Sequence, residues 1–174
     1  MKHLKNPKTI KYKKLKKTIL SNEFPWFYVD RIVKNADKRD DNPTWYSHGV
    51  LTRPVQGTRY PKESSPYLPQ ISEVLEEIFV HNNINTHCIY RININAVHPP
   101  VTTTYSTVQH VDHDFPHKNL IIYLTDAGGD TLLYQDDNII NHTPSEDDII
   151  SFVGLHSYNL PTTTRRVVLV CTYM

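Results

Sequence analysis

The sequence predicts a mainly β protein with flanking helices, arranged as a sandwich or barrel such as a jelly roll. Two observations lead to this fold class. From residue 84 onward, short runs rich in β-branched and aromatic residues follow one another, separated by turn-forming segments and without helical periodicity between them. Before residue 84, two stretches have the spacing of amphipathic helices, which we expect to pack on the outside of the β structure.

The two predicted helices cover residues 8–20 and 69–82. The first is short and basic, and the second has the clearest pattern, with Pro69 in its first turn. The apolar positions that share one face are Tyr12, Leu15 and Ile19 in the first helix, and Ile71, Val74, Leu75, Ile78 and Phe79 in the second.

The segment between these helices is predicted to hold one strand and one long loop. Residues 26–33 favour a strand. Residues 35–68 are polar, proline-bearing and non-periodic, which indicates a loop without regular structure. Such a loop is either a plain surface connection or a lid with aromatic and basic contacts to a substrate.

The C-terminal half is predicted to consist of strands. They are residues 88–97, 105–113, 119–126, 129–136, 138–143, 147–154 and 165–174. We expect one domain over residues 1–174, in which residues 1–83 pack on a core formed by residues 84–174.

The composition is that of an ordinary soluble globular protein. Hydrophobic residues make up 39% and charged residues 21% of 174, with a formal net charge of +1. Cys88 and Cys171 lie in apolar, strand-like runs, so we expect buried free thiols. No apolar stretch is long enough to cross a bilayer, and no secretory signal is evident, so we expect a cytoplasmic protein, in the host cytoplasm if it is viral.

The first 17 residues carry eight lysines. A basic block of this kind binds nucleic acid or an anionic surface in some proteins, and in most it is a solvated helix face. The sequence is compatible with a basic binding segment and with a solvated helix face.

The segment Gln109 to Asp114 is the main candidate for a metal site. In a strand, His110 and Asp112 project from the same face, while Val111 packs on the other side. An imidazole and a carboxylate on one face are two ligands of the facial triad that holds non-heme Fe(II). His156 follows an apolar strand and is the best candidate for the third ligand.

Other interpretations of this segment remain open. It can be a solvated polar loop or an adventitious zinc site. His113 with Asp114 is a shifted alternative to the first pair, although adjacent residues of a strand point to opposite faces.

The chain also offers an anchor for a 2-oxo acid. Three protein ligands leave three positions on iron, of which a 2-oxo acid can fill two and O2 the third. Arg165 begins an otherwise apolar strand, where a guanidinium needs an anionic partner such as the distal carboxylate of 2-oxoglutarate. The hydroxyl of Tyr123 can donate a hydrogen bond to the same carboxylate. Arg166 is expected to face solvent.

The order of these motifs resembles the prolyl 4-hydroxylase-like branch of the 2-oxoglutarate/Fe(II) oxygenases, particularly its small members in bacteria and phages. The matching segments are HVD at 110–112, LIIYLTD at 120–126, GGDT at 128–131, DDIISFVGLH at 147–156 and RRVVLVCTY at 165–173. The resemblance covers roughly residues 84–174.

The resemblance implies a double-stranded β-helix core, the cupin-like form of a jelly roll. It implies that His110, Asp112 and His156 hold Fe(II), and that Arg165 with Tyr123 holds 2-oxoglutarate. Tyr105 and Thr131 are further candidate contacts to cofactor or substrate.

The implied reaction hydroxylates an unactivated C–H with O2, and ascorbate is expected to support the activity. The implied substrate is a prolyl residue of a peptide or protein, or a small molecule. Two other functions remain open: a cupin-like metalloprotein that does not use 2-oxoglutarate, and a non-catalytic jelly-roll binding module. Metal binding and succinate formation distinguish them.

Overall fold

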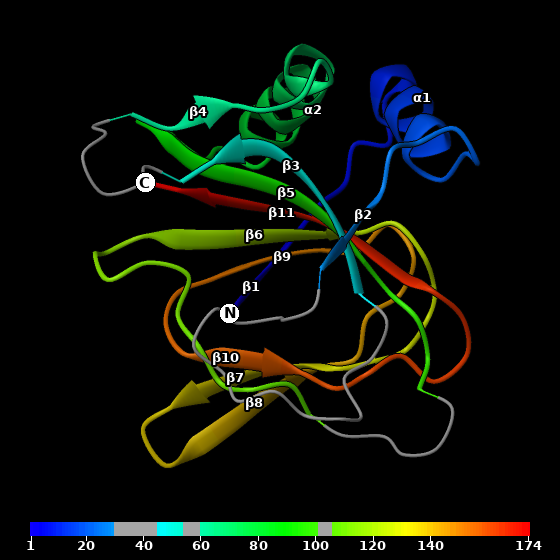
Figure 1. The fold of residues 1–174 in the computed structure, drawn as a ribbon. Helices are drawn as coiled ribbons and strands as arrows, with labels where there is room; N and C mark the ends of the chain where they lie inside the picture. Colours follow the sequence, from blue (N-terminus) through cyan, green and yellow to red (C-terminus); the bar gives the residue numbers. More distant parts are fainter. Residues whose placement is uncertain (30–44, 54–59, 101–105) are drawn as a thin grey trace.

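Two antiparallel sheets face each other in the computed structural model, which describes residues 1–29, 45–53, 60–100 and 106–174 (Figure 1). The larger sheet has eight strands in the order β1-β9-β6-β11-β5-β3-β2, with β4 paired to β3, and the smaller sheet has the order β10-β7-β8. The strands are β1 (Lys2–Leu4), β2 (Phe27–Val29), β3 (Trp45–Thr52), β4 (Lys62–Glu63), β5 (Ile89–Val97), β6 (Lys118–Tyr123), β7 (Thr131–Gln135), β8 (Asn138–His142), β9 (Ile149–Phe152), β10 (His156–Tyr158) and β11 (Arg166–Tyr173).

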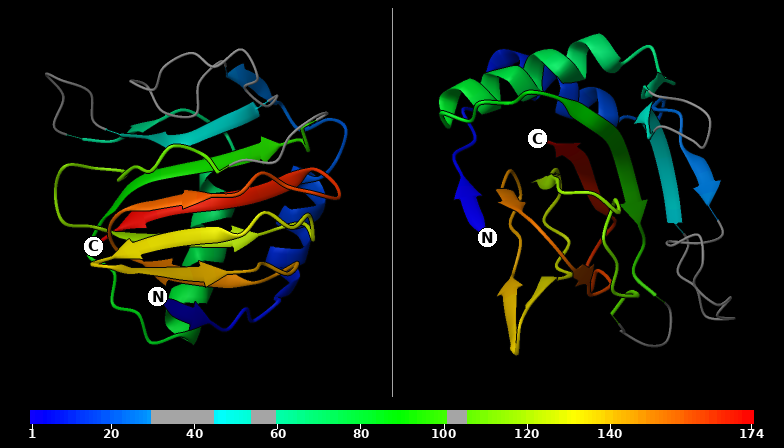
Figure 2. Two further views of the ribbon diagram at one scale, coloured as in Figure 1. Left: turned by 90° about the horizontal axis from the view of Figure 1, so that it is seen from below. Right: turned by 90° about the vertical axis from the view of Figure 1, so that its left-hand side faces the viewer.

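Helices α1 (Ile10–Ile19) and α2 (Leu68–His81) cover the outer face of the large sheet, and the small sheet lies on its other side (Figure 2). The side chain of Thr9 caps α1 by accepting a hydrogen bond from the backbone N–H of Tyr12. In both helices, the apolar residues predicted from the spacing are the buried ones. The two helix predictions are therefore confirmed.

The outer face of the large sheet forms the main hydrophobic core with these helices. Alternate residues of β5 point into it, and they are Ile92, Ile94 and Ala96. The intervening residues of β5 therefore belong to the inward face, the side of the large sheet that faces the small sheet. A second apolar cluster lies on this inward face and includes Leu133 from the small sheet.

The prediction of a loop without regular structure over residues 35–68 is wrong in part. Residues 45–52 form β3, which pairs with β5 along most of its length. Gly49 breaks the run of strand-forming residues in this segment, which weakens the strand pattern in the sequence. In the structure, the pairing with β5 shifts between Gly49 and Leu51. Residues 35–44 and 54–59 lie outside the described part of the chain, and the lid hypothesis falls largely on them.

The predicted strand over residues 105–113 is also wrong for the described residues 106–113. They form only two isolated bridges, at Ser106 and His110. Val111 is 48% exposed instead of packed in an apolar interior. Two strands that were not predicted, β1 and β10, are three residues long and depend on the partners β9 and β7.

The lysine-rich N-terminal segment makes ion pairs within the protein. Lys8 lies 3.2 Å from Asp147, which Lys16 also contacts, and Lys11 lies 3.1 Å from Glu73 of α2. These lysines connect α1 to its neighbours, which favours a structural role over nucleic-acid binding. Cys88 and Cys171 are free thiols, of which Cys171 is buried. No described helix is long and apolar enough to cross a membrane.

Candidate metal centre

His110 and His156 lie directly opposite each other on neighbouring segments. The backbone N–H of His110 donates to the carbonyl of His156 at 2.9 Å, and the reverse hydrogen bond measures 3.0 Å. Residues paired in this way project from the same side of the ladder, and the two ring centroids are 4.4 Å apart. The structure thus brings together two imidazoles that are 46 residues apart in the sequence.

Both imidazoles have the same nitrogen engaged by the backbone. Nδ1 of His110 lies 3.0 Å from the carbonyl of Val108, and Nδ1 of His156 lies 3.1 Å from the carbonyl of Gly154. Because a carbonyl only accepts, each Nδ1 carries the proton. Gly154, which supplies one of these carbonyls, has a φ of 93°, a conformation that glycine adopts at little cost. With Nδ1 bound to a backbone carbonyl in both rings, Nε2 is the nitrogen left to bind a metal.

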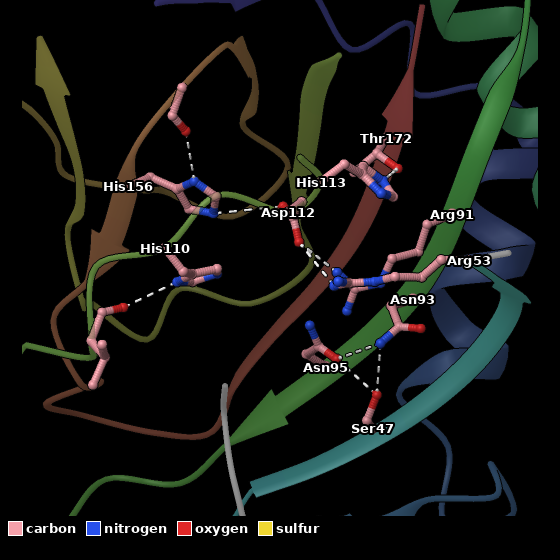
Figure 3. Close-up of polar contacts among 12 residues, drawn as sticks. Ser47, Arg53, Arg91, Asn93, Asn95, His110, Asp112, His113, His156 and Thr172 are labelled. Atoms are coloured by element: carbon pink, nitrogen blue, oxygen red, sulfur yellow. Dashed lines mark hydrogen bonds and ion pairs between the residues drawn. The ribbon is translucent and has the colours of Figure 1, made fainter. Parts of the chain in front are cut away.

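Asp112 is 4% exposed and lies beside these imidazoles (Figure 3). Its Oδ2 is 3.7 Å from Nε2 of His156, while its Oδ1 accepts a hydrogen bond from Nη1 of Arg91 at 2.6 Å. Nη2 of Arg53 lies 3.6 Å from the same Oδ1. One carboxylate oxygen is therefore held by guanidinium groups, and the other faces a histidine.

The electrostatics favour an ionised carboxylate and a neutral imidazole. Burial alone would raise the pKa of Asp112, but Arg91, together with the nearby His156, outweighs burial and holds that pKa below its ordinary value. Burial lowers the pKa of His156 to about 4, and His110 contributes in the same direction. These are the protonation states that metal binding requires.

The donor atoms are close but not gathered into a complete coordination set. Among the described residues, no group of three or more His, Cys, Asp or Glu already has its donors close enough to hold a metal ion. Two imidazoles and one carboxylate nevertheless match the chemistry of an Fe(II) facial triad.

The shifted pair His113 and Asp114 is not part of this arrangement. Nε2 of His113 is 2.8 Å from Oγ1 of Thr172 on β11, and its ring stacks on Phe115 at 4.7 Å. Asp114 is exposed. The structure therefore favours His110 and Asp112 over the shifted alternative.

The two arginines at the start of β11 are placed opposite to expectation. Arg166 is 3% exposed and lies on the inward face, so the prediction that it faces solvent is wrong. Arg165 is partly exposed and lies over the ring of Trp26, with 5.7 Å between its Cζ and the ring centroid. Arg165 therefore lies apart from Tyr123, its expected partner, and Arg166 takes its place.

Arg166, Tyr123 and Thr131 form one buried polar cluster. The Tyr123 hydroxyl is 2.7 Å from Oγ1 of Thr131, and Nη2 of Arg166 donates to the same oxygen at 3.4 Å. Burial raises the pKa of Tyr123, so its hydroxyl keeps its proton. Nε of Arg166 is buried and has no hydrogen-bond partner among the described residues. A buried guanidinium with an unpaired donor is suited to an anion. Tyr105, the other candidate contact, lies outside the described residues.

Sequence reasoning missed the residues of β5 and β3 that face the metal candidates. They are Ser47, Arg91, Asn93 and Asn95, and we call them the polar stripe (Figure 3). A signal for them exists in the segment RININ, where polar and apolar residues alternate with the two-residue period of a strand. Arg53, which directly follows β3, lies within the segment that the sequence predicts as a long loop.

Comparisons with known proteins identify the fold. No family model and no curated protein matches the sequence. The structure is similar to an oxidoreductase of the 2OG-Fe(II) oxygenase family from Burkholderia pseudomallei, with a TM-score of 0.62 and 14% identity over 87% of this chain and 73% of that chain. It is also similar to a prolyl hydroxylase from Trichoplax adhaerens in complex with a peptide fragment of the hypoxia inducible factor oxygen degradation domain, with a TM-score of 0.52 and 12% identity over 84% of this chain and 70% of that chain.

These neighbours belong to the group of proteins that the sequence resembles. At such low identities the similarity shows the fold alone. The prediction of a mainly β, jelly-roll core with flanking helices is thus confirmed. What the site does is a separate question, which depends on its residues.

Proposed function

We propose that this protein is an Fe(II)- and 2-oxoglutarate-dependent oxygenase that hydroxylates an unactivated C–H. The observation that carries the proposal is the backbone bridge between His110 and His156 next to the buried carboxylate of Asp112. It supplies two imidazoles and one carboxylate from two segments, which is the ligand set of a non-heme iron oxygenase.

His110 and His156 would hold Fe(II) through Nε2, and Asp112 through the oxygen that faces His156. With 2-oxoglutarate and O2, bound Fe(II) supplies the oxidative chemistry, which converts C–H to C–OH while 2-oxoglutarate becomes succinate and CO2. The protein's own contribution is orientation. The carbonyls of Val108 and Gly154 fix the two imidazoles, and Arg91 holds the carboxylate so that one oxygen stays available.

Arg166 would bind the distal carboxylate of 2-oxoglutarate, with hydroxyl donors from Tyr123 and Thr131. This assignment replaces Arg165, which lies against Trp26. Support comes from the unpaired Nε of Arg166 and from the apolar surroundings, which strengthen a charge-assisted hydrogen bond.

The substrate that we propose is a prolyl residue of a peptide or protein. The sequence resembles prolyl 4-hydroxylases, and one neighbour with the same fold is a prolyl hydroxylase in complex with a peptide fragment. A small-molecule substrate is the other outcome of a substrate screen. Ascorbate is expected to sustain activity by keeping iron reduced.

The test is succinate formation from 2-oxoglutarate with Fe(II) and ascorbate, with and without prolyl peptides. Asp112→Ala should abolish turnover and weaken metal binding, measured by titration with Mn(II). Asp114→Ala, which removes an exposed carboxylate two residues away, is the matched control and should keep both properties. Metal binding without succinate would favour a cupin-like protein that does not use 2-oxoglutarate. Absence of stoichiometric metal binding would favour a non-catalytic module.

A further inference from the structure

The polar stripe is unusual for the inside of a jelly roll. Its three residues on β5 lie on a strand with paired neighbours on both sides, β11 and β3. Side chains in such a position are normally apolar, because burying a polar group without a partner is unfavourable. The stripe residues are instead partly exposed, so solvent or a ligand can reach them.

The members of the stripe are connected to one another by hydrogen bonds. Oγ of Ser47 lies 2.9 Å from Oδ1 of Asn95 and 3.0 Å from the Asn93 carboxamide. With its oxygen turned toward Arg91, the Asn93 carboxamide accepts from Nη2 of Arg91 at 3.1 Å and from the Ser47 hydroxyl. The stripe therefore has fixed geometry and leads from β3 to the guanidinium that touches Asp112.

The β3 residues paired with the two asparagines are small. Gly49 lies opposite Asn93 in the strand register, and Ser47 lies opposite Asn95. Neither carries a bulky side chain that could cover the carboxamides.

The charges at the end of the stripe are unbalanced. Arg91 and Arg53 share a single oxygen of Asp112. In the loaded site, the charges of Fe(II), of Asp112 and of the chelating carboxylate of 2-oxoglutarate would cancel one another. The two guanidinium groups would then leave an excess of positive charge, and the half-exposed Arg53, which at 3.6 Å is the more weakly held of the two, can turn toward another group.

We infer that the substrate carries a carboxylate, which binds Arg53 beside Arg91, while the carboxamides of Asn93 and Asn95 bind an adjacent amide of the same molecule. The inference rests on the proposed function and narrows its substrate to acyl amino acids or peptides with a carboxylate next to the oxidised residue. A guanidinium fork matches the two oxygens of a carboxylate, and a carboxamide pairs with an amide through its donor and acceptor.

The test uses Mn(II)-loaded protein with saturating 2-oxoglutarate, because Mn(II) broadens the proton NMR signals of molecules bound near it. The probes are two matched pairs: N-acetyl-L-proline with N-acetyl-L-prolinamide, and N-acetylglycine with N-acetylglycinamide. Each pair differs by one carboxylate. We expect each acid to be broadened at about tenfold lower concentration than its amide, since one charge-assisted contact contributes roughly that factor.

Two variants locate the effect. Arg53→Gln should remove the difference between acid and amide, and Lys62→Gln, which removes an exposed charge on the neighbouring strand β4, should keep it. Equal broadening of acid and amide, or no broadening of either, would overturn the inference. A difference that survives in Arg53→Gln would overturn it as well.

Broadening of 2-oxoglutarate itself is the internal control. If 2-oxoglutarate is broadened and the acids are not, the carboxylate inference fails and the proposed function stands. If 2-oxoglutarate is not broadened, the proposed function fails first.

Discussion

The inward face of the large sheet has two unlike halves. Across β6, β9 and β11 it is mainly apolar, apart from the buried Asn119, Arg166 and Thr172. The apolar half is formed by Ile121, Ile150, Phe152 and Val168, which pack with Leu133 of the small sheet. Across β5 and β3 it carries the polar stripe. The boundary runs between two directly paired residues, Val168 of β11 and Asn95 of β5.

The difference between the two halves separates the part of the inward face that is covered by the small sheet from the part that a ligand can reach. The apolar half is covered by the small sheet and surrounds the buried Arg166 cluster, so it suits a small, desolvated anion. The polar half is partly exposed and touches the ligand candidate Asp112. We expect substitutions in the first half to act on stability and co-substrate binding, and those in the second on the metal site and substrate.

The largest expected effect comes from Arg91→Gln in the metal-free protein. It leaves the buried carboxylate of Asp112 without its closest partner, and loss of one member of a buried pair costs about 3–5 kcal/mol. Urea unfolding at pH 7 measures it. The double variant Arg91→Gln/Asp112→Asn should recover much of the loss, because no buried charge remains. Strictly additive effects would show that the two residues do not interact.

The adjacent arginines give the next largest contrast. Arg166→Gln should weaken 2-oxoglutarate binding about 10- to 100-fold, because charge-assisted hydrogen bonds contribute roughly 1.5–3 kcal/mol. Arg165→Gln should change it less than about twofold, because contacts of a partly exposed cation with an aromatic ring are worth ~1 kcal/mol or less and lie elsewhere. The apparent KM for 2-oxoglutarate reports both. The opposite ranking would restore Arg165 as the anchor.

A swap across the boundary tests the two halves directly. Val168→Thr places a hydroxyl in the apolar half and should lower the free energy of unfolding by about 1–2 kcal/mol. Asn95→Val extends the apolar half by one residue and should change that free energy by less than about 0.5 kcal/mol, because the replaced group is partly exposed. Similar losses in both variants would mean that the halves do not differ.

The smallest effect concerns the pH dependence of stability through His142, which lies on β8 of the small sheet. Burial lowers the pKa of His142, with His3 contributing, so the folded protein binds the proton less well than the unfolded chain. The neutral form stabilises the fold fully above the ordinary pKa of about 6.5, and this contribution falls as the pH drops below it. The slope for one proton is at most about 1.4 kcal/mol per pH unit. His142→Gln should reduce the slope of urea midpoints against pH below 6.5, and an unchanged slope would contradict the assignment.

Prediction from the sequence succeeded where the spacing of apolar residues within one segment was enough to identify the element. Helices α1 and α2 follow from apolar spacing alone, since each buries a single stripe. The strand β3 was missed because its glycine and polar residues suit the site better than they suit a strand. Each bridge in residues 106–113 needs a partner from β10 or the residue that follows it, which no local pattern indicates.

The orientation of Arg165 and Arg166 is the clearest example of a feature that the sequence could not predict. Both faces of β11 are apolar, because one packs on the helices and the other on the small sheet. The alternation of polar and apolar residues therefore does not indicate which residues of β11 face inward. The pairing of Arg166 with Val97 of β5 decides it, and a shift by one residue would exchange the two arginines.

Spacing within a few residues was enough to predict the helices, most strands, the jelly-roll class and the kinds of side chain available for metal and anion binding. Three features appear only in the folded protein: His110 faces His156, Arg166 is the buried arginine, and Arg91 holds Asp112. Each of these depends on strand register between distant segments, and a side-chain period of two makes register the property that local sequence specifies least when both faces of a strand are buried.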